Sequence, residues 1–328
     1  MARSPVRWGI LGTGWIAGVF TSDLHTAGCV VTAVGSRRQD SADAFAREHS
    51  IEHPHASYEA LVADPDVDIV YVATPHAFHA RDACLALDAG KHVLVEKAFT
   101  LNAREAQAVA SLAERQGRFL MEAMWTRFLP HMVRIREIVA AGTLGDARTL
   151  LADHNQSLPK DPAHRVNNPQ LGGGALLDLG IYPVSFAWNL FGPPKQVRAM
   201  ATMTATGVDR QIGVLLEHND GRQTVMQAAL DTAGPNRAVV LGTAGRIEID
   251  PIWYQATSFT VFDVAGAVHE RYVSTVSGRG MQYQALEAER CIQAGLTSSD
   301  LLPPAESVAI MGTLDEIRAQ IGLRYPGE

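Results

Sequence analysis

The stretch VRWGILGTGWIAG, residues 6–18, decides the fold of the first part of this chain. Its apolar half, Val6–Leu11, predicts a short strand, and Gly12-Thr13-Gly14-Trp15-Ile16-Ala17 reads G-x-G-x-x-A where a helix should begin. The first glycine permits a tight turn, the second lets the backbone approach a pyrophosphate, and Ala17 lets helix and strand pack closely. The helix N-terminus offers free N–H groups and a positive dipole end to phosphates. An ordinary glycine-rich turn is the alternative, but the context favours a dinucleotide site.

Apolar runs and helical segments alternate from this stretch to about residue 123. The later predicted strands are Val30–Val34, Asp68–Thr74, His92–Glu96 and Phe119–Glu122. The predicted helices are a segment ending near His25, then Ser41–His49, Ala77–Asp88 and a segment from the cap Asn102 to about Arg115. Nearly continuous apolar strands joined by helices are typical of a parallel sheet covered on both faces. We therefore predict an α/β, doubly wound Rossmann domain over residues 1–125.

The pattern changes after residue 126, where helices Leu129–Ala141 and Ala175–Leu190 precede a series of strands. The predicted strands are Val197–Thr206, Gln211–His218, Thr224–Asp231, Ala238–Leu241, Arg246–Ile249, Ser258–Val264 and Val268–Val273. Helices Met281–Ala294 and Ala305–Ile321 follow. Successive strands without helices between them indicate an α+β domain, residues 126–328, with a large, open, mainly antiparallel sheet.

Composition narrows the class of protein. The 328 residues carry a net charge of −7 with 47% hydrophobic residues, and Lys and Arg are scattered, which disfavours a nucleic-acid partner. No apolar stretch reaches the ~18 residues that span a bilayer, and the apolar run Val6–Leu11 is too short for the hydrophobic region and cleavage site of a signal peptide. The three cysteines, Cys29, Cys84 and Cys291, are far apart and form no CxxC. We expect reduced thiols in a cytoplasmic protein that does not bind or span a membrane.

The end of the second predicted strand indicates which nicotinamide cofactor binds. An NAD site there places an acid on the ribose 2′-hydroxyl, but this chain has Gly35-Ser36-Arg37-Arg38 and no acid before Asp40. A hydroxyl and guanidinium groups suit a 2′-phosphate, which a carboxylate would repel. Arg37 and Arg38 could instead be solvated charges at a helix start. The sequence favours NADP over NAD.

The chain resembles the glucose–fructose oxidoreductase/inositol dehydrogenase superfamily (Gfo/Idh/MocA) over nearly its whole length. The motifs that carry this resemblance are Gly12–Ala17, Ala73-Thr74-Pro75-His76 with His79, Ala89-Gly90-Lys91-His92-Val93, Glu96-Lys97, Gly172-Gly173-Gly174 and Asp178-Leu179-Gly180. Within the superfamily, Met121–Phe128 and Gly180-Ile181-Tyr182-Pro183 are most similar to the dimeric dihydrodiol dehydrogenases. The same branch contains NADP-linked D-xylose 1-dehydrogenases.

The resemblance implies three catalytic residues. Hydride transfer from a carbinol requires a base for the hydroxyl proton and a cation for the developing oxyanion. Tyr182 is the expected acid/base, Lys97 its charge partner and hydroxyl clamp, and Asp178 the carboxylate that orients the substrate. Asp178 and Tyr182 are four residues apart, so they should share a helix face. Lys97 should end a parallel strand, at the edge where α/β sheets bind ligands.

The resemblance also extends the cofactor site. Thr74, Pro75 and His76 should border the ribose and nicotinamide, and the remaining expected cofactor contacts are His79, Glu96, Lys97, Trp125 and Arg127. One residue departs from the superfamily: Ala98 follows Lys97, where Glu-Lys-Pro is common. His53 and His55 are read as part of a surface loop, and no set of ligands has zinc spacing, so we predict no metal.

These inferences predict an NADP-dependent dehydrogenase that acts on a ring CH–OH, either an aldose such as D-xylose or a trans-dihydrodiol. The alternative is an NADPH-dependent reductase of a keto- or anhydro-sugar or an inosose. Two further hypotheses, less favoured by the sequence, are a glycosidase that retains NAD and a non-catalytic NADP sensor. Ser157–Gln170 is expected to frame the pocket and to set specificity.

The resemblance further implies a homodimer, formed through one face of the second domain's sheet. Val214, Leu216 and Val225 alternate along two predicted strands. They could serve this contact or belong to the core.

Overall fold

The computed structural model describes residues 5–328, which fold into two compact units. Unit 1 contains the chain up to Trp125 together with Ser277–Val308, and unit 2 contains Thr126–Val276 and Ala309–Glu328. Residues 1–4, which the sequence analysis included in the first domain, lie outside the described residues.

Unit 1 contains a six-stranded sheet in the order β3-β2-β1-β4-β5-β6, and all its strand pairs are parallel. Its strands are β1 (Arg7–Leu11), β2 (Val30–Gly35), β3 (His53–His55), β4 (Ile69–Val72), β5 (His92–Glu96) and β6 (Leu120–Ala123). The predicted parallel sheet is confirmed. Strand β3 was not predicted, because its three residues, His-Pro-His, carry no apolar pattern.

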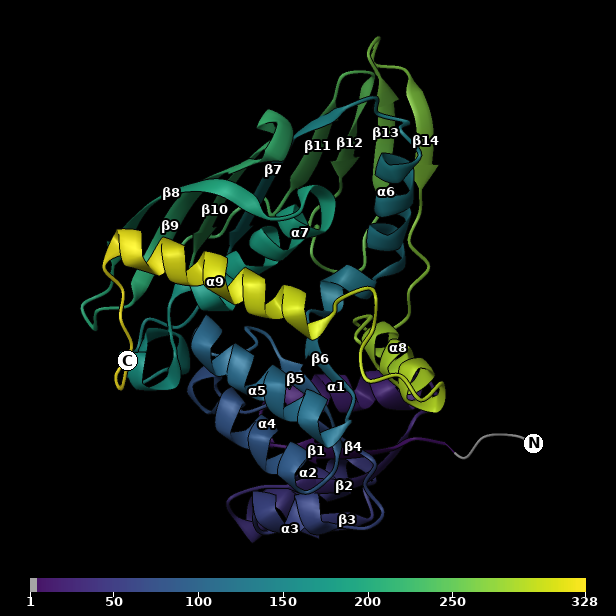
Figure 1. Ribbon diagram of the computed structural model, residues 1–328, viewed down its shortest axis with the longest axis vertical. Coiled ribbons are helices and arrows are strands. Elements are labelled where there is room, and N and C mark those ends of the chain that lie inside the picture. The colour runs from purple at the N-terminus through teal and green to yellow at the C-terminus, as the bar shows by residue number, and fades with distance from the viewer. Residues whose placement is uncertain (1–4) are drawn as a thin grey trace. The chain divides into compact units, whose positions relative to one another are not determined.

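The helices of unit 1 were predicted from the sequence, except the third, Tyr58–Ala63, and the last was expected in the second domain (Figure 1). They are α1 (Trp15–Thr26), α2 (Gln39–His49), α3 (Tyr58–Ala63), α4 (His79–Asp88), α5 (Ala103–Gln116) and α8 (Gln282–Gln293). Helix α5 begins where the sequence indicates, since the Asn102 side chain accepts the Glu105 N–H at 2.9 Å. Helix α9 (Pro304–Ile321) begins in unit 1 and ends in unit 2.

The segment Ser277–Val308 packs in unit 1, although the sequence analysis included it in the second domain. Polar contacts from β1 and α1 explain this placement. The buried Asp23 carboxylate accepts the backbone N–H groups of Arg279 at 3.1 Å and Met281 at 2.7 Å. The Trp8 indole N–H donates to Glu289 at 2.8 Å. Such contacts join residues that are far apart in the sequence, so no local sequence pattern predicts them.

Unit 2 contains an eight-stranded sheet in the order β14-β13-β12-β11-β7-β10-β9-β8. Its strands are β7 (Ala147–Asn155), β8 (Pro194–Met203), β9 (Asp209–His218), β10 (Gln223–Ala229), β11 (Ala238–Gly242), β12 (Gly245–Ile249), β13 (Phe259–Asp263) and β14 (Val268–Tyr272). All pairs are antiparallel except β7–β10, which confirms the predicted mainly antiparallel sheet.

Helices α6 (Pro130–Ala140) and α7 (Ile181–Phe191) belong to unit 2, and Figure 1 shows α7 beside β7 and β10. The single helix predicted over Ala175–Leu190 has two parts, because Leu176–Gly180 forms a π-helical turn before α7. Short π-helical insertions of this kind occur frequently at functional sites. Within residues 5–328, every helix is too short or too polar to cross a lipid bilayer.

Candidate functional site

The glycine-rich turn has the geometry of a phosphate-binding loop. Gly12 adopts φ +109°, and a Cβ there would lie 3.0 Å from the Ala73 carbonyl oxygen, so a side chain is excluded. Gly14 is the N-cap of α1 and supplies no side-chain cap, and the first turn of α1 contains no acidic residue. The amide groups at this helix start therefore suit an anion, and the residues present fit the pyrophosphate of a dinucleotide.

Two indole rings and a guanidinium group lie close to this helix start. Trp15, the first residue of α1, is 69% exposed, whereas Trp125 is buried. The Arg279 guanidinium carbon lies 5.2 Å from the Trp15 ring centre and 5.1 Å from that of Trp125. Arg279 Nε is buried and has no hydrogen-bond partner. Sequence reasoning missed Arg279, because it reaches α1 from the remote segment Ser277–Val308.

The end of β2 supplies two cationic groups, and no acid precedes Asp40. Ser36 is buried, and its N–H donates to the His55 carbonyl at 3.1 Å. Arg37 and Arg38 are both exposed, and Arg38 lies 3.8 Å from Asp40. Since both guanidinium groups are accessible, this turn fits a ribose 2′-phosphate.

The loop after β4 is tied to the turn that carries Lys97. Thr74 and His76 are buried here, and the Thr74 hydroxyl oxygen has no hydrogen-bond partner. His79 is also buried, with Nε2 2.7 Å from the Thr74 carbonyl oxygen and Nδ1 2.8 Å from that of Ala98. Burial lowers the pKa of His79, although hydrogen bonds to these two carbonyl oxygens oppose the change. Both ring nitrogens thus contact backbone, which makes His79 a link between loops.

Lys97 directly follows β5 and is partly exposed. The Lys97–Ala98 peptide bond is cis, at the position where the superfamily commonly has proline. Neighbouring side chains hold this turn: Glu122 accepts the Phe99 N–H at 3.1 Å and the Ser307 hydroxyl at 2.7 Å. Glu96, expected to contact the cofactor, is buried and accepts a hydrogen bond from the Tyr71 hydroxyl.

In unit 2, the π-helical turn carries Asp178, which is 4% exposed, and the first turn of α7 carries Tyr182, which is 6% exposed. Arg165 donates to both Asp178 carboxylate oxygens, at 3.0 and 3.4 Å. Arg165 belongs to the predicted specificity segment Ser157–Gln170, and about half of its side chain is exposed. The carboxylate is thus oriented by a fork-shaped cation from a surface segment.

Tyr182 belongs to an aromatic cluster that the sequence did not reveal. His154 stacks on Tyr254 with ring centres 3.7 Å apart, and Tyr182 meets His154 edge-on at 4.9 Å. His154 Nδ1 lies 3.2 Å from the Leu179 carbonyl oxygen. His154 is on β7 and Tyr254 follows β12, so neither lies near the motif that contains Tyr182.

Arg127, expected to contact the cofactor, is buried in unit 2. Its guanidinium donates to the Ser185 carbonyl at 3.0 Å and the Ser185 hydroxyl at 3.2 Å, and its own carbonyl accepts from Arg136 at 2.6 Å. These contacts anchor α7, which carries Tyr182.

A buried carboxylate holds the start of the π-helical turn. Asp209 Oδ2 accepts the Leu176 N–H at 2.6 Å, and the Tyr325 hydroxyl donates to the Gly173 carbonyl at 2.6 Å. Gly174 has φ +119°, and a Cβ there would lie 2.1 Å from Asp209 Oδ1, so the carboxylate requires glycine. Burial raises the pKa of Asp209 to about 7, although the hydrogen bond from Leu176 opposes this rise.

Two family models match the chain. The oxidoreductase family with a NAD-binding Rossmann fold (GFO/IDH/MocA) matches residues 6–124, and the GFO/IDH/MocA C-terminal domain matches residues 132–248. The trans-1,2-dihydrobenzene-1,2-diol dehydrogenases of Mus musculus and Danio rerio are 37% and 36% identical in sequence to this chain. Each match covers 98% of this chain and 98% of the relative.

Solved structures are similar over almost the whole chain. An aldose-aldose oxidoreductase from Caulobacter crescentus, complexed with glycerol, has a TM-score of 0.87 and 25% identity over 97% of both chains. A 3-ketoreductase from Actinomadura kijaniata, in complex with NADP and TDP-benzene, has a TM-score of 0.86 and 25% identity over 97% of this chain and 98% of its own.

We predict that Asp209 makes the stability of the protein depend on pH. With a folded-state pKa of about 7, Asp209 stays protonated in the folded protein where the unfolded chain, with a pKa of about 3.9, has already lost the proton. The unfolding free energy should therefore fall as pH rises from about 4 to about 8, by roughly 4 kcal/mol from this group. Asp209→Asn cannot ionise, so denaturant unfolding of this variant should lack that part of the pH slope.

The exposed Asp146 provides the control, since Asp146→Asn should retain the slope of the parent protein. Equal slopes in the parent protein and Asp209→Asn would contradict the prediction.

Proposed function

Because this chain belongs to the GFO/IDH/MocA family, it is an NADP-dependent oxidoreductase that acts on CH–OH groups, and we propose that its substrate is a ring alcohol. The candidates are an aldose such as D-xylose and a trans-dihydrodiol. The observation that carries this proposal is the match over 98% of the chain to relatives named trans-1,2-dihydrobenzene-1,2-diol dehydrogenase. The direction of the reaction depends on the cofactor ratio.

Unit 1 is the proposed NADP-binding domain. The amides that begin α1 would hold the pyrophosphate, and Ser36, Arg37 and Arg38 would hold the 2′-phosphate. Arg279 is a further candidate for a phosphate contact, because its Nε is buried without a partner beside the exposed Trp15. Thr74 has a buried hydroxyl oxygen that is also without a partner and could serve the same cofactor.

Unit 2 is the proposed substrate-binding domain. The nicotinamide, when bound, supplies the site that accepts or returns hydride. The protein must handle the proton, and we assign this task to the Tyr182 hydroxyl. Its aromatic neighbours His154 and Tyr254 support the assignment, because they fix the ring and leave the phenol little freedom. Lys97 is the proposed cation that steadies the oxyanion as the proton leaves.

Asp178 is the proposed orienting carboxylate. Its two oxygens are held by Arg165, so it can accept hydrogen bonds from substrate hydroxyls in a fixed direction. Because Arg165 lies on the segment Ser157–Gln170, changes in this segment would alter the direction in which Asp178 accepts. This arrangement supports that segment as a determinant of specificity.

A second candidate is an NADPH-dependent reductase of a keto-sugar. The similarity to a 3-ketoreductase crystallised with NADP favours it. It uses the same residues in the opposite direction: the Tyr182 hydroxyl gives its proton to the carbonyl oxygen as that oxygen becomes an alcohol.

We also propose a homodimer formed through the outer face of the unit 2 sheet. Val214 and Leu216 are buried and belong to the core, whereas Val225 is exposed. Val225 pairs with Leu151 on β7 and with Leu215 on β9, so three apolar side chains form a row across neighbouring strands. These side chains are 39% (Leu151), 41% (Leu215) and 46% (Val225) exposed. A second copy of the chain would cover this row.

A cytoplasmic location agrees with the cysteines. Cys29, Cys84 and Cys291 are all free in the described chain, and burial raises the pKa of each thiol, so the thiols stay protonated at neutral pH. We propose the cytoplasm, where thiols are kept reduced.

A substrate panel tests the proposed function. Aldoses and trans-dihydrodiols are offered with NADP⁺ or NAD⁺, keto-sugars are offered with NADPH, and reduced nicotinamide is followed by its absorbance. We expect turnover of at least one ring alcohol with a clear preference for NADP⁺. No change in nicotinamide absorbance with any member of the panel would contradict the proposal.

Replacing both Arg37 and Arg38 by Ala should raise the KM for NADP⁺ about 10- to 100-fold and leave the KM for NAD⁺ unchanged. Arg104→Ala, an exposed change on α5, is the control.

Replacing Tyr182 by Phe removes the proposed acid/base and keeps the ring. The expected result is a kcat about 10²- to 10⁴-fold lower, with the KM for NADP⁺ unchanged. Steady-state kinetics over a range of pH measure both quantities. Tyr272→Phe, on β14 against Phe259, is the matched control and should behave as the parent enzyme. A Tyr182→Phe enzyme with near-normal turnover would exclude this role.

Charge on the exposed apolar row tests the dimer. Leu215→Asp should convert a dimer to a monomer, because a desolvated carboxylate in an apolar contact is costly. Analytical ultracentrifugation measures the mass. Val264→Asp, an equally polar change at an exposed residue of the β13–β14 turn, should leave the dimer intact. A parent protein that sediments as a monomer, or a Leu215→Asp protein that remains dimeric, counts against this interface.

A further inference from the structure

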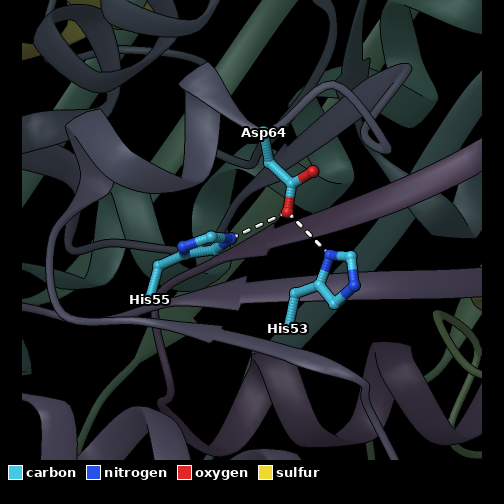
Figure 2. Close-up of side chains that lie close together, drawn as sticks. All are labelled: His53, His55 and Asp64. Atoms are coloured by element: carbon cyan, nitrogen blue, oxygen red, sulfur yellow. Dashed lines mark hydrogen bonds and ion pairs between the residues drawn. The ribbon is translucent and has the colours of Figure 1, made fainter.

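Two imidazoles and a carboxylate converge at the edge of the unit 1 sheet. His53 and His55 lie on the edge strand β3, and Asp64 follows α3 (Figure 2). Because the two histidines are two residues apart on a strand, their side chains leave the same face. Asp64 Oδ2 lies 2.9 Å from His53 Nδ1 and 2.8 Å from His55 Nε2.

We propose that His53, His55 and Asp64 bind one divalent transition-metal ion of the Zn²⁺ class. One ligand atom from each residue lies within 4.8 Å of the other two. Two imidazoles and one carboxylate are a ligand set that zinc and other first-row divalent ions accept, whereas Mg²⁺ and Ca²⁺ prefer oxygen ligands alone. Since His53 and His55 are partly exposed, water can complete the coordination and the ion has a path of entry.

The two nitrogen–oxygen distances are close to those that a metal ion requires, and the two nitrogens lie within 4.8 Å of each other. Bonds of about 2.0–2.2 Å at tetrahedral angles separate neighbouring ligand atoms by roughly 3.4 Å. The two imidazole nitrogens would therefore each move about 0.5 Å away from Asp64 Oδ2 to admit the ion. The ion would replace the protons that these nitrogens now share with the carboxylate.

The carboxylate is already oriented for this task. Asp64 is buried, and its other oxygen, Oδ1, accepts the Asp66 N–H at 2.8 Å, so Oδ2 is turned to the histidines. Lys91 Nζ donates to the Asp64 carbonyl at 2.7 Å and fixes the backbone at the same residue. Outer contacts of this kind commonly orient metal ligands.

A bound ion would fasten β3 to the end of α3. Strand β3 has a single neighbour in the sheet, β2, so the edge is otherwise held by few backbone hydrogen bonds. The His55 carbonyl accepts the Ser36 N–H, so an ion at this site would also steady the end of β2. The competing interpretation is a hydrogen-bonded His–Asp–His cluster that takes no ion.

Calorimetric titration with zinc separates these interpretations. Tag-free protein, stripped with a chelator, is titrated with zinc chloride, and thermal unfolding is measured with and without zinc. We expect one equivalent to bind and the melting temperature to rise, because an ion that binds only the folded state stabilises it. Affinity should fall at least tenfold in His53→Gln and in His55→Gln. His25→Gln, an exposed change on α1, should bind as the parent does.

Three outcomes would overturn the proposal: no zinc bound by the parent protein, a zinc affinity in both histidine variants that equals the parent's, or displacement of zinc by equimolar Mg²⁺. Equal affinity in the variants would place the ion on other groups. Asp64→Asn is a further variant, but Asp64 is buried. The two histidine variants decide the test, since the partly exposed imidazoles are the smaller risk to folding.

Discussion

The nucleotide-binding edge of unit 1 depends on a residue without a side chain, Gly12. At Gly12 a side chain would meet the Ala73 carbonyl, and the Gly12 N–H donates to the Gly35 carbonyl at 3.0 Å. One residue thus joins the ends of β1, β2 and β4, the three neighbouring strands at the middle of the sheet. The helix start, the Ser36 turn and the Thr74 loop therefore share a fixed edge, because each follows a strand that Gly12 touches.

Strands, helix starts and single-turn motifs could be predicted, because they depend on residues that are adjacent in the sequence. The period of the apolar residues predicted five of the six strands around Gly12, and the cap at Asn102 marked the start of α5. Motifs on single turns, such as the one at Gly12, could be interpreted because their chemistry depends on residues adjacent in the chain. The same reasoning failed at β3, where three residues without an apolar pattern form a strand only because β2 provides a neighbour.

Contacts between remote segments could not be predicted in this way. Arg279 lies over Trp15, and His154 and Tyr254 surround Tyr182, but no spacing in the chain relates these residues. The π-helical turn before Tyr182 was also missed, because it depends on the Asp209 carboxylate, which binds the Leu176 N–H from β9. Buried polar groups of this kind fix backbone groups in place, and their partners are set by the tertiary fold.

The register of β10 connects the two proposed tasks of the unit 2 sheet. Thr224, Met226 and Ala228 are buried, and Met226 lies close to Gly180, which ends the π-helical turn. Val225 lies between them in sequence and faces outward, in the row with Leu151 and Leu215. Side chains alternate along a strand, so a one-residue shift in the pairing of β10 would have two effects at once. It would move Met226 away from Gly180, and it would turn Val225 into the core. The pairing that supports the turn beneath Tyr182 therefore also exposes the surface proposed for dimer formation.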